Sequence, residues 1–137
     1  MRALRDLIPH RPPWGLIDRL VSVEGNVVVA EKQVSGDDPL LGTGGLGGAL
    51  AIEALAQTAA CLMGRRGSDR GRHRGYLVAA RGFQFPSFAR PGETVTLRAE
   101  KTSELGDLHG FSGRATVGAR EIAAGTMTFA VRFGEEE

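Results

Sequence analysis

Glu53 and Gln57 are the residues of this chain whose types and spacing point most directly to chemistry. Glu53 is the only acidic or basic residue between Pro39 and Gly64, in a segment rich in alanine and leucine. A carboxylate is costly to bury unpaired, and a carboxyl group removed from water is suited to proton transfer. If the segment is a helix, Gln57 lies one turn later on the same face and could orient the carboxyl group. Two interpretations stay open: a catalytic acid, or a structural glutamate that pairs with an arginine or faces solvent.

A glycine-rich loop, LLGTGGLGG over residues 40–48, precedes this segment. Gly42, Gly44 and Gly47 form a G-x-G-x-x-G pattern, but turn-forming residues 35–39 stand where a dinucleotide fold places a buried strand, and no P-loop lysine follows. These flanks disfavour a nucleotide-phosphate site. Unpaired N–H groups at a helix start suit a carbonyl oxygen that becomes an oxyanion. A flexible entry loop that needs special backbone angles is the alternative interpretation.

The histidines and the single cysteine offer no obvious second catalytic group. His10 lies in a prolyl segment and favours a structural role, His109 shares an expected strand face with apolar residues, and His73 lies in an arginine-rich stretch. Their spacing does not match a metal site, so no bound metal is expected. Cys61 lies in the most apolar segment, which predicts a small core residue and fits a reducing compartment.

The elements that must hold these residues are predicted from periodicity and turn signals. Two apolar runs between Trp14 and Val34 flank Glu24-Gly25-Asn26, which predicts a hairpin. Residues 48–63 predict one long helix that ends at Gly64, and because it is apolar on nearly every side it must be wrapped by other structure. Residues 65–75 are expected to form a loop. Strands then follow at about 76–85, 94–100, 108–117 and 121–133. The pattern predicts an α+β fold in which an antiparallel sheet curls around one long central helix.

Composition bounds the class of protein. The 137 residues carry 17 basic and 16 acidic side chains and 42% hydrophobic residues, which predicts one domain over residues 1–137 with an acidic tail at 134–137. A formal charge of +1 gives no reason to expect nucleic acid or a membrane surface as partner. With neither a signal peptide nor a run of about 18 apolar residues, we expect a cytoplasmic protein.

Three stretches carry a resemblance to a known family. They are PHRPP running into an apolar strand with Asp18-Arg19, the helix GALAIEALAQ, and GYLVAARGFQFPSFARPGETVTL with its Pro-Gly-Glu turn. Over about residues 7–132 the chain resembles the hotdog-fold 3-hydroxyacyl-acyl-carrier-protein dehydratases, and within them it is most similar to the branch of aryl polyene biosynthesis. The glutamate helix is the most specific part.

The resemblance implies a dimer of hotdog domains, homo- or heterodimeric, that accepts an acyl chain on phosphopantetheine of an acyl carrier protein or coenzyme A and needs no other cofactor. Glu53 would protonate the leaving 3-hydroxyl group and Gln57 would support it. The backbone at the helix start would contact the thioester carbonyl, through Gly44, Gly45, Gly47 and Gly48. A cluster of arginines would meet the acidic carrier: Arg65, Arg66, Arg70, Arg72 and Arg74.

The sequence departs from the family at the base. Similar enzymes carry a histidine in the loop before the helix, whereas LLGTGGLGG is shorter and has none. His10 or Asp38 could replace it, Glu53 could make both proton transfers, or a partner subunit could supply it. The functions predicted are therefore a dehydratase-like lyase of fatty acid or polyketide biosynthesis, with a hotdog thioesterase and a noncatalytic acyl-carrier-binding subunit as alternatives.

Overall fold

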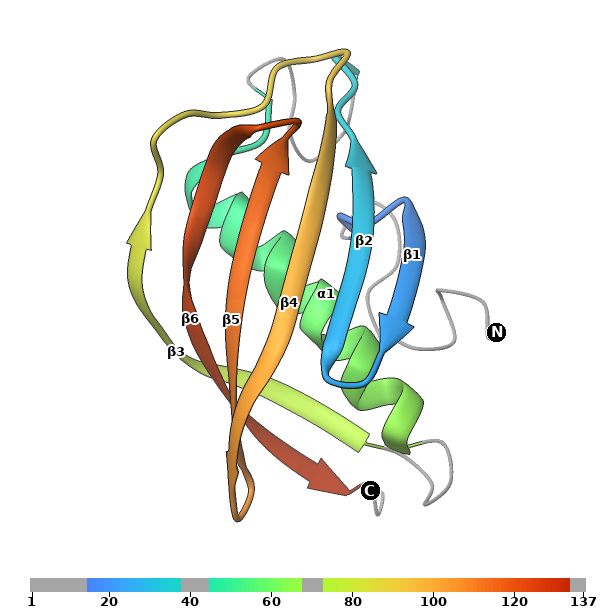
Figure 1. Ribbon diagram of the computed structural model, residues 1–137, viewed down its shortest axis with the longest axis vertical. Coiled ribbons are helices and arrows are strands. Elements are labelled where there is room, and N and C mark those ends of the chain that lie inside the picture. Colours follow the sequence, from blue (N-terminus) through green and yellow to red (C-terminus); the bar gives the residue numbers. More distant parts are fainter. Residues whose placement is uncertain (1–14, 38–44, 68–72, 134–137) are drawn as a thin grey trace.

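The computed structural model describes residues 15–37, 45–67 and 73–133, which form one helix and six strands (Figure 1). All six strands pair antiparallel in one sheet with the order β1-β2-β4-β5-β6-β3. In chain order the elements are β1 (Arg19–Glu24), β2 (Val27–Gln33), α1 (Gly48–Gly67), β3 (His73–Gln84), β4 (Thr94–Leu105), β5 (Leu108–Val117) and β6 (Arg120–Phe133).

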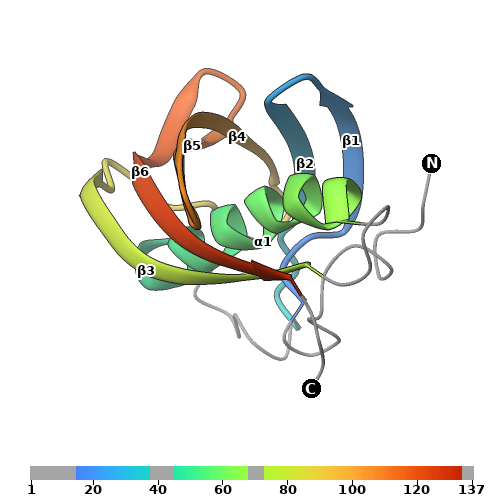
Figure 2. The same cartoon turned by 90° about the horizontal axis from the view of Figure 1, so that it is seen from below.

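The sheet curls around α1, so that the helix lies in its concave face (Figure 2). The helical residues that face the sheet are fully buried, among them Ala51, Ala54, Leu55 and Ala59. Small side chains on this face let the helix approach the sheet closely, and the larger apolar residues of the strands fill the space around it. The prediction of one apolar helix wrapped by an antiparallel sheet is confirmed.

The strands follow the predicted alternation. Val95, Leu97 and Ala99 of β4 are fully buried, whereas Thr96 between them is partly buried and Arg98 is exposed. Met127, Phe129 and Val131 of β6 face the same core. The predicted turns are also found, because β1 and β2 are joined at Gly25-Asn26 and β5 and β6 at Gly118-Ala119. Gly25 and Gly118 have φ angles of 60° and 59°, which glycine adopts without steric cost.

The prediction of a loop over residues 65–75 was wrong at both ends. The helix continues past Gly64 to Gly67, because arginine is a good helix former and its charge is favourable in a last helical turn. At the other end β3 begins at His73, which pairs with Phe133 of β6. His73 and Arg74 therefore belong to a strand. Cross-strand pairing, which local composition does not reveal, decides this boundary.

The two edges of the sheet differ in character. β1 forms one edge and β3 the other, and β3 exposes three consecutive large apolar residues, Tyr76 (50%), Leu77 (39%) and Val78 (56%). Such an edge offers both backbone hydrogen-bonding groups and apolar surface to another chain. Within the described residues, no helix is both long enough and apolar enough to cross a membrane.

Candidate active site

The start of α1 is fixed to a neighbouring loop by a short β-bridge. The N–H of Leu46 donates to the carbonyl oxygen of Ala89, and the N–H of Ala89 donates to the carbonyl oxygen of Leu46, both at 2.8 Å. Both residues are fully buried. The bridge holds the three residues that enter the helix, Gly45, Leu46 and Gly47, against the segment between β3 and β4.

Glycine is required at this turn for reasons of space and backbone angle. Gly45 has a φ of 86°, and a Cβ there would collide with the carbonyl oxygen of Ala89. A Cβ on Gly47 would lie 2.9 Å from that of Phe88. Gly48 has a φ of 54° and open space where a side chain would be. The glycines thus allow two segments to pack closely and leave the helix start uncovered by side chains.

The N-terminal turn of the helix presents backbone donors beside this open space. The first helical hydrogen bond runs from the N–H of Ala51 to the carbonyl oxygen of Gly47 at 3.4 Å. The preceding amides, those of Gly48, Ala49 and Leu50, have no carbonyl one turn earlier within the helix. Together with the helix dipole they favour negative charge at this end. The turn can therefore stabilise an oxygen on which negative charge develops.

Glu53 and Gln57 form a hydrogen-bonded pair one turn apart on α1. The Nε2 group of Gln57 donates to Oε2 of Glu53 at 3.3 Å, and Oε1 of Gln57 accepts from the N–H of Leu16 at 2.8 Å. Gln57 is fully buried, whereas Glu53 is only partly buried. Because Leu16 fixes the orientation of the Gln57 amide, the NH2 group of that amide is directed at the carboxylate. The predicted hydrogen bond between Gln57 and Glu53 is present, and the catalytic roles of the two residues stay predictions.

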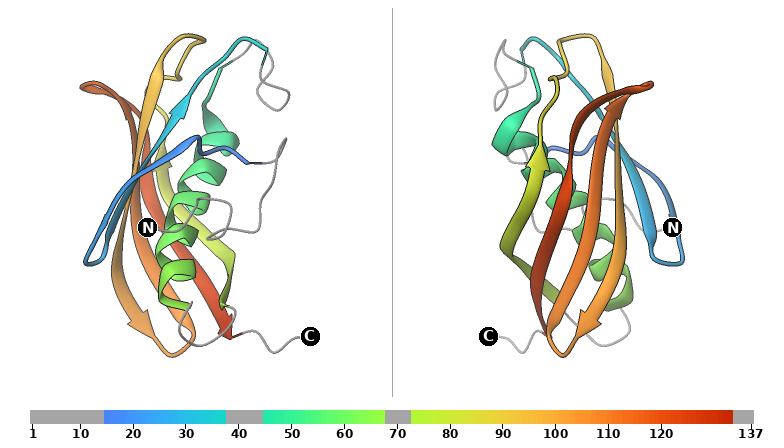
Figure 3. Two further views of the ribbon diagram at one scale, coloured as in Figure 1. Left: turned by 90° about the vertical axis from the view of Figure 1, so that its right-hand side faces the viewer. Right: turned by 60° about the vertical axis from the view of Figure 1, so that its left-hand side comes forward.

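The sheet leaves one side of α1 uncovered (Figure 3), and Glu53 is one of the helical residues that are only partly buried. Ala49 on this side is exposed, and Ile52 and Ala60 are partly buried. The sides of the helix that bear Ala54 and Leu55 are fully covered. Glu53 thus sits in an apolar stripe of α1 and is not enclosed in the core. This position is compatible with both interpretations of the sequence, a catalytic acid and a carboxylate that faces solvent.

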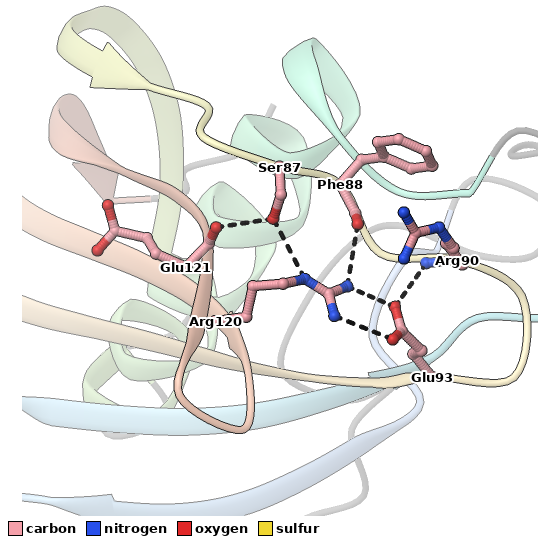
Figure 4. Close-up of polar contacts among 6 residues, drawn as sticks. All are labelled: Ser87, Phe88, Arg90, Glu93, Arg120 and Glu121. Carbon is pink, nitrogen blue, oxygen red and sulfur yellow. Dashed lines mark hydrogen bonds and ion pairs between the residues drawn. The ribbon is translucent and has the colours of Figure 1, made fainter.

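A second polar cluster joins the β3–β4 connection to the β5–β6 turn (Figure 4). Arg120 binds both carboxylate oxygens of Glu93, with nitrogen–oxygen distances of 2.6 and 3.1 Å. Its guanidinium also donates to the carbonyl oxygen of Phe88 at 3.1 Å and to the Ser87 hydroxyl at 3.3 Å. Glu93 accepts in addition from the N–H of Arg90 at 2.8 Å. These hydrogen bonds, those of Arg120 first, lower the pKa of Glu93 to about 2.

The structure places only some of the residues that the sequence singled out. Five of them lie at the start of α1 or just before it: Gly45 and Gly47 precede the helix, and Gly48, Glu53 and Gln57 belong to its first three turns. Other predicted site residues lie outside the described residues: His10, Asp38, Gly44, Arg70 and Arg72. The backbones of Arg65, Arg66 and Arg74 lie in the last turn of α1 and the start of β3.

The remaining predicted residues are where the sequence analysis put them. Cys61 is fully buried, and burial raises the pKa of its thiol to about 12, as suits a core residue. The side chain of His109 is 15% exposed on β5, with Nε2 3.9 Å from the Glu104 carboxylate. The start of β5 lies at the opposite end of the sheet from the start of α1 (Figure 1). His109 is thus mostly buried and lies on the part of β5 that is far from the start of α1.

Sequence reasoning missed two functional contacts. The backbone N–H of Leu16 donates to the Gln57 side chain, and a pattern of side-chain types cannot predict a backbone contact of this kind. Arg120 and Glu93 pair across 27 residues, and the only local signal was the Pro-Gly-Glu turn that contains Glu93. No group of three or more metal-ligating side chains is found within the described ranges.

Fold and site together define the class. A six-stranded antiparallel sheet around one central helix, with a carboxylate in the second helical turn, is a hotdog domain. The structure of the dehydratase heterocomplex ApeI:P from Xenorhabdus doucetiae matches it with a TM-score of 0.85 at 21% identity, covering 99% of this chain and 93% of that chain. A hypothetical thioesterase from Streptococcus pneumoniae with coenzyme A matches with a TM-score of 0.68 at 13% identity, covering 86% and 88%.

Sequence similarity is more specific than the fold. A family model described as ApeP-like, ApeP dehydratase, matches residues 2–132, and the chain belongs to this family. It is also 34% identical to the 3-hydroxyacyl-[acyl-carrier-protein] dehydratase FabZ of Staphylococcus carnosus, over 94% of this chain and 92% of that protein. Identity to FabZ of Chlamydia caviae is 32%, over 96% and 90%. The predicted membership of a hotdog-fold dehydratase-like family is confirmed.

Proposed function

We propose that this chain dehydrates 3-hydroxyacyl thioesters carried on the phosphopantetheine of an acyl carrier protein, with Glu53 as the acid. A base removes the proton from C2, the C2=C3 double bond forms, the C3–O bond breaks, and the hydroxyl group leaves as water with the proton of Glu53. The reaction transfers no electrons and therefore needs no redox cofactor. The observation that carries the proposal is the chain of contacts from Leu16 through Gln57 to Glu53 on the open side of α1.

The helix start supplies the second half of the proposed site. Removal of the C2 proton shifts negative charge onto the thioester carbonyl oxygen. The amides at Gly48 and Ala49 lie about one helical turn before Glu53, where they can donate to that oxygen. The absence of a side chain at Gly48 leaves room for the thioester to approach.

The base is proposed to come from a second hotdog subunit. No histidine stands between His10 and His73, so the family's base is missing from the loop before the helix. Two apolar surfaces support a partner: the exposed β3 edge at residues 76–78, and the open stripe of α1 beside Glu53. The ApeI:P structure is a heterocomplex of dehydratases and provides the precedent. Pairing would cover both surfaces and place a second chain next to Glu53.

The arginines between α1 and β3 are proposed to dock the acidic carrier protein. Five arginines stand within residues 65–74, a density that the rest of this nearly neutral chain does not repeat. A basic patch of this kind steers an acidic partner and sets its association rate. Reversing three charges in this stretch should raise KM for the carrier-bound substrate and leave turnover of a coenzyme A analogue unchanged.

The function is tested with 3-hydroxyacyl carrier protein and four protein samples. These are this chain alone, a hotdog protein encoded beside it alone, the two together, and the mixture with Glu53→Gln. We expect enoyl product in the mixture and its loss with Glu53→Gln. Product from this chain alone would place the base within it, and His10→Ala and Asp38→Asn would then identify the residue. Absence of enoyl product from every sample would refute the dehydratase function.

The assay also separates the alternative classes. Release of free thiol from acyl-coenzyme A, abolished by Glu53→Gln, would indicate a thioesterase. Tight binding of acyl carrier protein without any product would indicate a noncatalytic subunit.

A further inference from the structure

We infer that Arg120 is a positioning residue for the proposed reaction, because it holds the segment 87–93 that in turn fixes the helix start where the thioester carbonyl would bind. The inference rests on the proposed function. It states that Arg120, the first residue of β6, fixes the position of the backbone donors at the start of α1. Arg120 touches no substrate in this arrangement and acts only through the loop.

The first step is the attachment of Arg120 to the loop. Its guanidinium contacts three points along the segment: the Ser87 hydroxyl, the Phe88 carbonyl oxygen and the Glu93 carboxylate. Ser87 in turn donates to the carbonyl oxygen of Glu121 at 2.9 Å, so the loop is tied to β6 by two routes (Figure 4). A planar guanidinium that binds in a bidentate way and reaches two further acceptors fixes orientation, which a lysine cannot do.

The second step is the attachment of the loop to the helix. Ala89 follows Phe88, whose carbonyl oxygen Arg120 holds, and Ala89 makes both hydrogen bonds of the bridge to Leu46. Phe88 itself packs so closely on Gly47 that a Cβ there would be too near. The path from the guanidinium to the helix start therefore has two steps: Arg120 holds the Phe88 carbonyl oxygen, and Phe88 and Ala89 contact Gly47 and Leu46.

The third step is the consequence for catalysis. A pair such as Arg120 and Glu93, with side chains 37% and 27% exposed, adds little to stability on its own. Its contacts instead fix where the Gly48 amide lies relative to Glu53. A misplacement of about 1 Å can cost a rate factor of about 100. The contacts of Arg120 with segment 87–93 therefore contribute more to the precision of the site than to the stability of the fold.

The experiment compares Arg120→Ala with a matched control, Arg114→Ala. Arg114 also forms an ion pair, at 3.0 Å, but its partner is Glu121 of β6 and not a residue of segment 87–93. Amide hydrogen exchange of Leu46 and Ala89 is measured in each variant. We expect exchange at both amides to rise by about tenfold in Arg120→Ala, the order that loss of roughly one net hydrogen bond implies, and to be unchanged in Arg114→Ala.

Kinetics in the active mixture provide the second readout. With Arg120→Ala we expect kcat to fall by about 10- to 100-fold and KM to change by less than about threefold, because the affected contact strengthens in the transition state. Arg120→Lys keeps the charge and the fold, and it should recover only a minor part of kcat since one ammonium cannot bridge the carboxylate and the Phe88 carbonyl.

Unchanged exchange at Leu46 and Ala89 in Arg120→Ala would overturn the inference. Raised exchange with normal kcat would overturn it as well, because the loop would then not position the reaction. If the wild-type mixture forms no enoyl product, the proposed dehydration fails while the exchange data still decide whether Arg120 holds the helix start.

Discussion

Two regions of this domain each hold a glutamate, and the two carboxylates have partners of different kinds. On α1, Glu53 accepts a hydrogen bond from the neutral amide of Gln57 on the open side of the helix. In the β3–β4 connection, Glu93 is held by the Arg120 guanidinium and has a pKa of about 2. A carboxylate held by a bidentate arginine remains ionised and can fix geometry, but it cannot deliver a proton near neutral pH.

Under the proposed function, the domain divides its work between chemistry and positioning. The helix region would supply a carboxyl group and backbone donors to the substrate. The loop region would use a second carboxyl group, held by Arg120, to keep those donors in place. The difference between the two glutamates lies in their partners: Gln57 lies one turn from Glu53 on the same helix, whereas Arg120 is 27 residues from Glu93 in the chain.

The largest effect that this comparison predicts is the loss of dehydration with Glu53→Gln. Glutamine keeps the size and a hydrogen bond to Gln57 but cannot donate an acidic proton, so kcat should fall by about 10²- to 10⁴-fold. The measurement is enoyl formation at saturating substrate in the mixture with the partner. Because the side chain is only partly buried, the unfolding midpoint in urea should change little.

Glu24→Gln is the matched control for this prediction. Glu24 is exposed at the end of β1, so the same chemical change there should leave kcat and stability unaltered. If Glu53→Gln retained more than a third of the wild-type kcat, Glu53 would not be the acid. The two glutamates would then not differ in the way that the proposed reaction requires.

A second, smaller effect is expected for Gln57→Leu. The substitution removes the donor to Glu53 and leaves the buried N–H of Leu16 without its acceptor, which costs about 1–3 kcal/mol of unfolding free energy. We expect kcat to fall by about tenfold, because Glu53 is no longer oriented. Urea unfolding and the enoyl assay measure the two effects separately.

Thr58→Val tests whether the effect is specific to the Gln57 position. Thr58 is also fully buried and polar, but its hydroxyl donates within the helix, to the carbonyl oxygen of Ala54 at 2.9 Å. Its replacement should change both quantities only slightly. An equal loss of kcat in the two variants would show that the effect is not specific to Gln57 and follows from the loss of any buried polar group of the helix.

The helix region could be predicted from the sequence and the loop region could not, for physical reasons. The helix region was predictable because its signals are local: an isolated acid in an apolar segment, an amide one turn later, and glycines before the first turn. The loop region was not, since Arg120 finds Glu93 only after the sheet has formed. The same cause misplaced the start of β3, where pairing with β6 extends the strand to His73.

The smallest expected effect concerns the titration of Glu93. Its pKa is lowered from the usual 4.5 to about 2, so the ion pair stabilises the folded state above pH 4.5, and this contribution is lost as the pH falls toward 2. Carboxyl carbon NMR should therefore give a Glu93 midpoint near 2 in the wild-type protein and a midpoint much closer to 4.5 in Arg120→Ala. The stability difference between these two proteins should likewise shrink below pH 4.5. A wild-type midpoint near 4.5 would mean that Arg120 does not hold this carboxylate in solution, and the loop would then need another anchor to keep the helix start beside Glu53.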